Sequence, residues 1–347
     1  LNIMIRVRIL WSLLWQKKIA ISRVINLVRN QASYYLKSET ASQSPSILIV
    51  EPTNVCNIAC YSCRDENKRI YSHFYKEHPG TIPLGKVNIE VYKSVIDELK
   101  NDILIAVLYV QGEPLLYKGI HEMIKYATER NVPTMTATNG MPLTIDACRN
   151  LVENGLDFIK IAVSGFTQKT YGRYHIGGDI EVIKENIKRL VNARNEKKSN
   201  LYIMVDYILF DYNRDEFHLF NKFCERLGIK CITRHGLLPI SFKNGNAEME
   251  RVKPKRRLCD WLWHVAVINW DGSVCPCCQF PVASDPITLG NIDSNGYSLK
   301  SIWNSEKYRS FRRQHIRHGR SKAFVCDRCD WEGVGLQAVK ERIPQNL

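Results

Sequence analysis

The chain has 347 residues, of which 45% are hydrophobic and 24% charged, and it carries a formal net charge of +14. This composition excludes an intrinsically disordered chain, and the length predicts one large domain plus a smaller one, each with its own core. Nine of the twelve cysteines fall into clusters, which favours metal binding in a reduced compartment over a disulfide framework.

The N-terminal segment 1–38 is both basic and apolar. It carries seven Lys or Arg side chains and no acid, among Ile, Leu and Trp residues. Its apolar stretch 9–15 is too short to span a bilayer and lacks the cleavage site of a signal peptide. We predict a basic amphipathic helix within a helical extension over 1–45, which packs on an anionic membrane surface, on a partner or on the protein's own flank.

From residue 46 onward, apolar β-rich runs alternate with segments of helical period. The predicted strands cover residues 47–50, 103–110, 132–137, 158–163, 201–209 and 230–233. The predicted helices cover residues 89–99, 120–130, 145–153, 180–194 and 215–227. Because six strands interleave with helices and no dinucleotide-binding GxGxxG is present, the pattern predicts an α/β fold with a partial (β/α)6 TIM-like barrel over 46–240.

Polar residues, and glycines that leave the backbone accessible, follow the first four predicted strands. The cysteines of 56–63 follow the first strand, and segments 111–114, 138–140 and 164–165 follow the next three. Each glycine could simply serve a tight turn, and Glu113-Pro114 could simply begin a helix. Because the carboxyl ends of barrel strands meet at one mouth, four such loops together predict a functional site there.

After about residue 240 the pattern changes. A basic linker, 241–257, precedes a cysteine-rich region with short strands, one of which is predicted over 265–270 before an Asp-Gly turn. We therefore predict a small C-terminal α+β domain over 241–347.

The first cysteine cluster places three thiols within eight residues. A structural zinc site needs four ligands, so His73 or His78 would have to complete it. A [4Fe–4S] cluster normally takes four cysteines, so three would leave one iron open to a small molecule.

The spacing CxxxCxxC over residues 56–63, directly after the first strand, resembles the radical S-adenosylmethionine (radical SAM) superfamily. The Gly-Glu-Pro at 112–114, after the second strand, is similar to that family's "GGE" segment. The resemblance implies that Cys56, Cys60 and Cys63 hold a [4Fe–4S] cluster that SAM chelates. It also implies a 5′-deoxyadenosyl radical that abstracts hydrogen from a substrate.

The same resemblance implies contacts with SAM. Gly112 and Glu113 would meet its amino end, while Asn139 and Ser164 would line its ribose or carboxylate side. The chain departs from the family at Ser62, where an aromatic residue often packs on the adenine.

The second cysteine set resembles the SPASM or shorter twitch extension, which implies one auxiliary [4Fe–4S] cluster. The implied ligands are Cys259, Cys277, Cys326 and Cys329. Cys275 and Cys278 are alternative ligands and, if they are not ligands, candidates to donate a hydrogen atom to a substrate radical. A four-cysteine zinc ribbon built on the pairs 275/278 and 326/329 is the competing interpretation.

These observations predict a cytoplasmic radical SAM enzyme, peripheral to the inner face of the membrane if residues 1–38 bind lipid. Its substrate would be a sugar, aminocyclitol, peptide or lipid-linked precursor, and the basic surface favours an anionic one. Oxidation or epimerisation would follow hydrogen abstraction, with flavodoxin or ferredoxin as external electron donor.

The alternative hypothesis is a zinc-containing basic protein that binds nucleic acid. It is motivated by basic runs at 251–257 and 307–322, which could contact phosphates. Such runs are usually solvated faces, and neither a recognition-helix motif nor a stacking-aromatic signature accompanies them.

Overall fold

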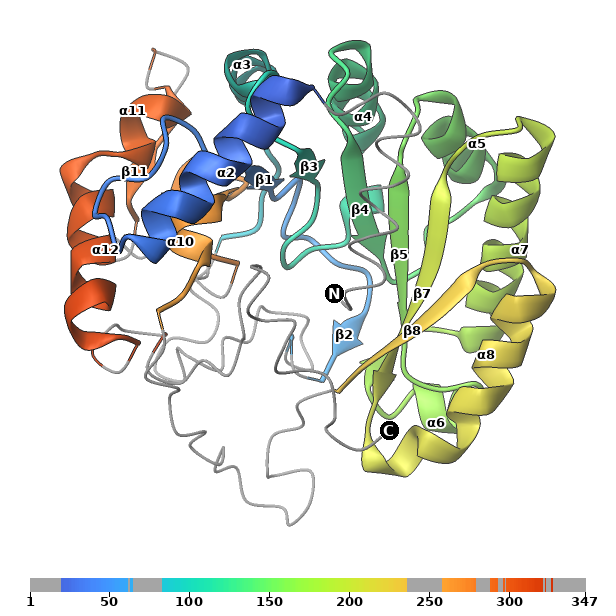
Figure 1. The fold of residues 1–347 in the computed structure, drawn as a ribbon. Helices are drawn as coiled ribbons and strands as arrows, with labels where there is room; N and C mark the ends of the chain where they lie inside the picture. Colours follow the sequence, from blue (N-terminus) through green and yellow to red (C-terminus); the bar gives the residue numbers. More distant parts are fainter. Residues whose placement is uncertain are drawn as a thin grey trace.

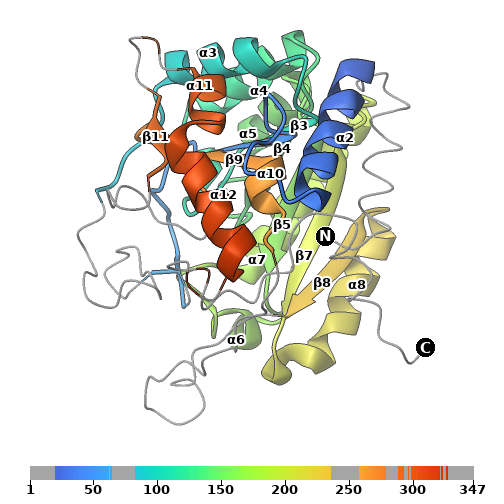
Figure 2. The same ribbon diagram turned by 60° about the vertical axis from the view of Figure 1, so that its left-hand side comes forward.

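The computed structural model describes residues 20–61, 63–64, 83–235, 258–278, 288–292, 296, 298–320, 322 and 326. Nine strands form one sheet in the order β11-β10-β9-β1-β3-β4-β5-β7-β8. Six neighbouring strands are parallel: β1 (Ile47–Val50), β3 (Ile105–Val107), β4 (Thr134–Thr138), β5 (Phe158–Val163), β7 (Tyr202–Leu209) and β8 (Lys230–His235). With helices on the outer face of this curved sheet (Figures 1 and 2), they confirm the predicted partial (β/α)6 barrel.

In the described part of the chain, five helices of nine or more residues lie between consecutive parallel strands. They are α3 (Ile89–Leu99), α4 (Ile120–Glu129), α5 (Ile145–Glu153), α7 (Ile180–Glu196) and α8 (Phe217–Arg226). Side chains of Asn88, Thr144 and Asp179 accept hydrogen bonds from backbone N–H groups of the first turns of α3, α5 and α7, which explains where these helices begin. The 3-10 helix η2 (Asp211–Glu216) precedes α8, so the regular α-helix begins later than the predicted 215–227.

The C-terminal region continues the sheet of the barrel. β9 (Val265–Ile268) pairs in parallel with β1, and β10 (Ser273–Cys275) and β11 (Gly290–Asn291) follow in antiparallel pairings. Leu262 and Trp303 belong to the same buried cluster as the barrel strands. The expectation that each domain has its own core was therefore wrong, because the β1–β9 ladder lets one core run through both regions.

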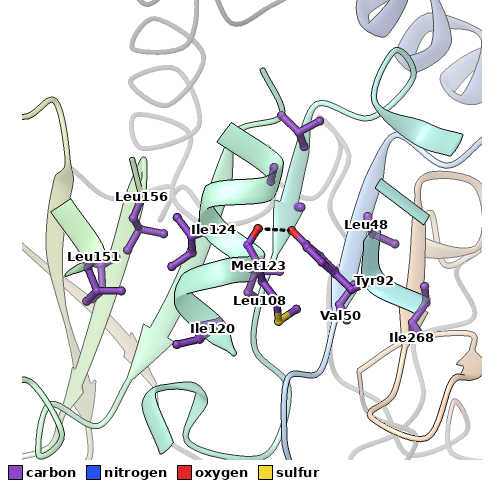
Figure 3. Packing of buried hydrophobic residues seen from close by; sticks show 14 of the residues in the cluster. Leu48, Val50, Tyr92, Leu108, Ile120, Met123, Ile124, Leu151, Leu156 and Ile268 are labelled. Atoms are coloured by element: carbon purple, nitrogen blue, oxygen red, sulfur yellow. Dashed lines mark hydrogen bonds between the residues drawn. The ribbon is translucent and has the colours of Figure 1, made fainter. Parts of the chain in front are cut away.

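The main core lies between the strands and their helices, as Figure 3 shows for β1, β3 and α4. Val50 at the end of β1 and Leu108 directly after β3 are buried in this core and lie near Met123 of α4. Tyr92 of α3 is also buried there, and its hydroxyl donates to the carbonyl oxygen of Met123 at 3.0 Å. A buried phenol with its hydrogen bond satisfied joins α3 to α4 without a polar penalty.

The basic run 307–322 contributes most of α12 (Glu306–His318), which packs against the barrel's C-terminal extension. Arg312 is fully buried and donates to the carbonyl oxygens of Leu262 at 2.8 Å and Trp303 at 2.9 Å. Arg313 pairs with Glu39 at 2.8 Å. Two of its cations thus serve internal structure, which weakens the motive for the nucleic-acid hypothesis. The linker 241–257 lies outside the described residues.

The N-terminal helix is α2 (Ile21–Tyr35), which contacts α10 (Trp261–His264) (Figure 1). It donates side-chain hydrogen bonds to backbone carbonyls of Pro45, Lys100 and Asn131, which precede β1, β3 and β4. The helix therefore covers the end of the barrel where these strands begin. None of the helices in the described ranges is long and apolar enough to cross a membrane.

Acid should destabilise the fold through the buried His264. Burial lowers the pKa of His264 to about 4, against an ordinary value of 6.5. Between pH 7 and pH 5 the unfolded chain takes up a proton here that the folded chain does not, so the free energy of unfolding should fall by about 2 kcal/mol. Urea titrations at both pH values should show a smaller fall for His264→Phe. The exposed His218→Phe is the control and should retain the wild-type fall.

Candidate active site

The cysteine loop follows β1 at the carboxyl end of the sheet. Its three half-buried thiols are those of Cys56, Cys60 and Cys63. Within the loop, β2 (Ala59–Cys60) pairs antiparallel with β6 (His175–Ile176). The N–H of Cys63 donates to the carbonyl oxygen of Cys60 at 2.8 Å. Backbone hydrogen bonds thus fix the positions of two of the three thiols.

The loops after β3 and β4 contact these thiols. The side-chain amide of Asn139 donates to the sulfur of Cys56 at 3.8 Å and to Oδ1 of Asn57 at 2.8 Å. The thiol of Cys63 donates to the carbonyl oxygen of Gln111 at 3.7 Å. The structure therefore brings together the predicted loops after the first three strands.

Glu113 joins these three loops. Its N–H donates to the carbonyl oxygen of Val55 at 2.8 Å, and its carboxylate accepts from the N–H groups of Asn139 at 2.7 Å and Leu115 at 3.1 Å. Burial raises the pKa of Glu113 to about 7, although both hydrogen bonds favour the charged form. Its predicted contact with the amino end of SAM stays a prediction.

Gly112 lies where the loop after β3 touches the cysteine loop. A Cβ at this position would lie 2.0 Å from the carbonyl oxygen of Thr53 and 2.8 Å from Cα of Asn54. Both contacts are with backbone, so a rotamer change could not relieve them. The glycine is therefore needed for close approach, beyond any role in a tight turn.

The electrostatics of the thiols suit a metal centre that carries positive charge. Burial, with the neighbouring thiols of Cys63 and Cys56, raises the pKa of Cys60 well above its usual range. Burial raises the pKa of Cys63 to about 11, while the buried Arg64 acts in the opposite direction. Three thiolates here would repel one another unless positive charge is added, and metal binding would release their protons.

A zinc site in this loop would need a fourth ligand beside the three thiols. No three Cys, His, Asp or Glu side chains within the described part of the chain converge to hold one metal ion. His73 and His78, which could have completed a zinc site, lie outside the described residues, as does Ser62. Three protein thiols in one loop are the ligand set of a [4Fe–4S] cluster with one open iron, which the loop's sequence predicts.

Ser164 contacts His175, a residue of the strand that pairs with the cysteine loop. It is fully buried, and its hydroxyl lies 2.6 Å from Nδ1 of His175 and 3.3 Å from the carbonyl oxygen of Tyr171. Burial lowers the pKa of His175 to about 3, so this imidazole is neutral. Because His175 lies opposite Cys60 in the β2–β6 pair, these side chains position the loop. The predicted contact of Ser164 with SAM stays a prediction.

The second set of cysteines lies at the β9–β10 edge of the sheet. Cys259, Cys277 and Cys278 pack against the cluster formed by Ile49, Trp261, Val265 and Val267. Cys275 is buried on β10, where the amide of Asn269 donates to its sulfur at 3.1 Å and burial raises its pKa to about 12. Cys326 is buried, and Cys329 lies outside the described residues. The structure thus places two of the implied auxiliary ligands, Cys259 and Cys277, against one apolar cluster.

The barrel also contains a charged cluster that the sequence did not predict. Asp206 of β7 accepts from Nε of Arg234 at 2.8 Å and lies 3.4 Å from Nζ of Lys160. Nζ of Lys160 donates to the hydroxyl of Tyr109 at 3.4 Å. Oδ1 of Asp206 is buried and has no hydrogen-bond partner among the described residues. The cluster therefore combines two cations, one carboxylate and one unused acceptor.

Family models match both regions of the chain. A model of the radical SAM superfamily matches residues 50–220, and a model of the SPASM iron–sulfur cluster-binding domain matches residues 259–330. Together they cover more than half of the chain, and they match the regions that carry the two cysteine sets.

Curated relatives are named as a cofactor-modifying protein, a heme synthase and a maturase. The chain is 22% identical over 331 residues to the tungsten-containing aldehyde ferredoxin oxidoreductase cofactor-modifying protein of Pyrococcus furiosus, which covers 82% of this chain and 88% of that protein. It is 24% identical over 194 residues to the AdoMet-dependent heme synthase of Nitratidesulfovibrio vulgaris, over 55% of this chain and 47% of the relative. It is 24% identical over 155 residues to the mycofactocin maturase MftC of Mycobacterium tuberculosis, over 45% of this chain and 37% of that protein. The chain thus spans most of the first relative and less than half of the other two.

Solved structures share the fold. SuiB of Streptococcus suis bound to S-adenosylmethionine superposes with a TM-score of 0.58 at 14% identity, over 90% of this chain and 78% of that chain. BtrN in complex with AdoMet and 2-DOIA superposes with a TM-score of 0.51 at 20% identity, over 83% of this chain and 94% of that chain. Two cysteine sets on this fold, each matched by its own family model, show that the chain belongs to the radical SAM superfamily and carries a C-terminal SPASM domain.

Proposed function

We propose that the protein is a radical SAM enzyme that modifies a peptide or a cofactor-sized small molecule in a reduced cytoplasm. The observation that carries this proposal is the cysteine loop, whose thiols contact the loops after β3 and β4. When bound, the reduced [4Fe–4S] cluster supplies the electron that cleaves SAM to methionine and a 5′-deoxyadenosyl radical, which takes a hydrogen atom from the substrate. An external donor such as flavodoxin or ferredoxin would provide that electron.

The residues of the chain hold and protect this site. Burial raises the pKa of Cys60 and Cys63, and Arg64 opposes this rise, which favours the thiolates that bind iron. Glu113 keeps the loops after β3 and β4 against the cysteine loop, through hydrogen bonds at both its backbone and its carboxylate. Shielding from water would protect a radical intermediate from side reactions.

We propose oxidation as the fate of the substrate radical. Cys259, Cys277, Cys326 and Cys329 would hold the auxiliary cluster, which could supply a one-electron acceptor near the substrate. Loss of one electron from the radical to that acceptor, and of a proton to a base, would leave a new double bond in the product. Cys275 is buried, and its sulfur accepts a hydrogen bond from the amide of Asn269. It is therefore poorly placed to donate a hydrogen atom to a substrate. Epimerisation with Cys278 as hydrogen donor is the second candidate, because Cys278 is half-buried beside the lumen-facing residues of β1 and β9.

The charged cluster in the barrel supports an anionic substrate. Lys160 and Arg234 together carry one positive charge more than Asp206 neutralises. Arg234 is half exposed and Lys160 is mostly buried, so the cost of the excess charge falls mainly on Lys160, and an anionic oxygen of the substrate would offset it. The unused Oδ1 of Asp206 could accept a hydrogen bond from an N–H or O–H group of the same substrate. A carboxylate or phosphate beside such a donor is the substrate chemistry that fits this cluster.

Two variants should test whether the positive charge of this cluster exceeds its negative charge. Asp206→Asn leaves two cations without a carboxylate and should lower the free energy of unfolding by about 3 kcal/mol. Lys160→Met leaves the Arg234–Asp206 pair balanced and should change it by less than about 1 kcal/mol. Urea denaturation measures both. If Lys160→Met destabilised the protein as much as Asp206→Asn, the charge imbalance would be disproved.

Anaerobic reconstitution tests the proposed function. The reduced holoenzyme with SAM should release 5′-deoxyadenosine even without substrate, whereas stable binding of zinc with no 5′-deoxyadenosine would overturn the proposal. Once a substrate is found, turnover in deuterated water separates the two fates of the radical. Epimerisation through a thiol would place solvent deuterium on the product, and oxidation would yield an unlabelled product two hydrogens lighter.

A further inference from the structure

Helix α2 docks on the barrel through its polar side. Arg23 donates to the carbonyl oxygens of Lys100 and Asn131 at 2.6 and 2.9 Å, and Asn26 donates to the carbonyl oxygen of Pro45 at 2.9 Å. Asn30 is fully buried, donates to the carbonyl oxygen of Ser44 at 2.8 Å, and accepts from the N–H of Ser42 at 3.0 Å. An amphipathic helix normally buries its apolar side, so this docking is inverted.

The apolar side of α2 consequently faces away from the protein. Of the thirteen large apolar side chains that are exposed in the described part of the chain, six lie on or directly after this helix. They are Ile21, Val24, Ile25, Val28, Tyr35 and Leu36. At 100° per residue they occupy an arc of about 120°, opposite the three docking residues. We call these six residues the outer stripe of α2.

The charge along helix α2 is of one sign. The described residues 20–38 contain Arg23, Arg29 and Lys37 and no acid, although Arg23 lies on the docking side. Arg29 is exposed beside the stripe, and the first acid in the chain, Glu39, pairs with Arg313 at 2.8 Å. Exposed apolar side chains that include a tyrosine, with a cation beside them, suit the interface of an anionic bilayer.

We propose that the outer stripe of α2 binds the surface of anionic lipid membranes. Helix α2 would lie in the plane of the interface with the stripe among the acyl chains and Arg29 among the headgroups. Because α2 covers the strand beginnings, the barrel would rest on the membrane by that end. The cysteine loop, which follows β1, would then face the aqueous phase. This arrangement is independent of the reaction that the enzyme catalyses.

Co-sedimentation of the full-length holoenzyme with vesicles tests the proposal. Wild type should bind phosphatidylcholine vesicles that contain phosphatidylglycerol, bind pure phosphatidylcholine more weakly, and dissociate as ionic strength rises. Val28→Asp, in the middle of the stripe, should lower the partition coefficient by at least about tenfold, because it removes an apolar group and adds a charge of the lipid's sign. Ile145→Asp on α5 is the matched control, since Ile145 is 61% exposed and Val28 is 59% exposed. This control should bind like wild type.

Three results would overturn the proposal. One is a wild-type protein that does not bind anionic vesicles. In the second, the Val28→Asp variant binds vesicles as well as wild type, while deletion of residues 1–19 abolishes binding. The N-terminal segment alone would then make the membrane contact. The third is light scattering that shows a wild-type dimer and a Val28→Asp monomer without vesicle binding, because a second copy would then cover the stripe. Circular dichroism of each variant confirms that the fold is retained.

Discussion

Cys60→Ala should reduce the iron content of the reconstituted protein from about eight to about four atoms per chain. It should also abolish the release of 5′-deoxyadenosine from SAM. The reason is that Cys60 is held in the β2–β6 pair and belongs to the three-thiol loop, whereas the auxiliary thiols lie at the β9–β10 edge. Iron analysis and chromatography of the reduced reaction mixture measure both quantities.

Cys148→Ala is the matched control for this variant. Cys148 is buried on α5, its thiol donates to the carbonyl oxygen of Leu143 at 3.6 Å, and it belongs to the hydrophobic core. Its loss should affect stability modestly and leave iron content and SAM cleavage unchanged. A Cys60→Ala protein that retained wild-type iron and cleaved SAM would show that this loop does not hold the catalytic cluster.

Gly112→Ala should separate the loop after β3 from the cysteine loop. The added methyl group would meet the carbonyl oxygen of Thr53, and the hydrogen bond from Glu113 to Val55 would lengthen or break. We expect the free energy of unfolding to fall by about 3 kcal/mol, as for severe overpacking. We also expect loss of SAM cleavage, because Glu113 no longer holds the loops together. Urea denaturation and the 5′-deoxyadenosine assay measure these effects.

Gly172→Ala is the control for the glycine variant. Gly172 ends α6 (Gln168–Tyr171) in a helical conformation, and an added methyl group would lie 3.1 Å from the carbonyl oxygen of Gln168. Small adjustments can relieve this contact, so its stability should change by less than about 1 kcal/mol. Equal damage from both substitutions would mean that the close approach at Gly112 has no special importance.

The strong periodic elements of the barrel could be predicted to the residue. Strands 47–50 and 158–163 and helices 89–99 and 145–153 match the structure. Each is a run of one period bounded by turn or capping residues. The predicted strand 103–110 is longer than β3 (Ile105–Val107) because Ile103 belongs to the turn after α3. Apolar character alone does not distinguish a buried turn residue from the strand that follows it.

Other parts of the site have no local signal. The strands β2 and β6 are two residues long and exist because they pair with each other, so no periodicity marks them. Lys160, Asp206 and Arg234 lie on three strands, and only the register that places Ala162 opposite Asp206 and Ile208 opposite Arg234 brings the charges together. Arg64 had a signal that went unused, because a cation directly follows the third cysteine of the loop.

The direction in which α2 faces also required the structure. A helix with one apolar and one polar side has the same sequence period whichever side it buries. What decides the orientation is that the loops before β1, β3 and β4 offer backbone carbonyls, which Asn and Arg side chains satisfy and aliphatic side chains cannot.

The pairing of β1 with β9 has a consequence for biosynthesis. It joins segments from distant parts of the chain, so β1 leaves the ribosome long before its second neighbour exists. Until β9 arrives, one edge of Ile47–Val50 remains unpaired and open to adhesion between nascent chains. A polypeptide truncated after β8 would keep that edge permanently, so the barrel is expected to aggregate when it is expressed without the cysteine-rich region.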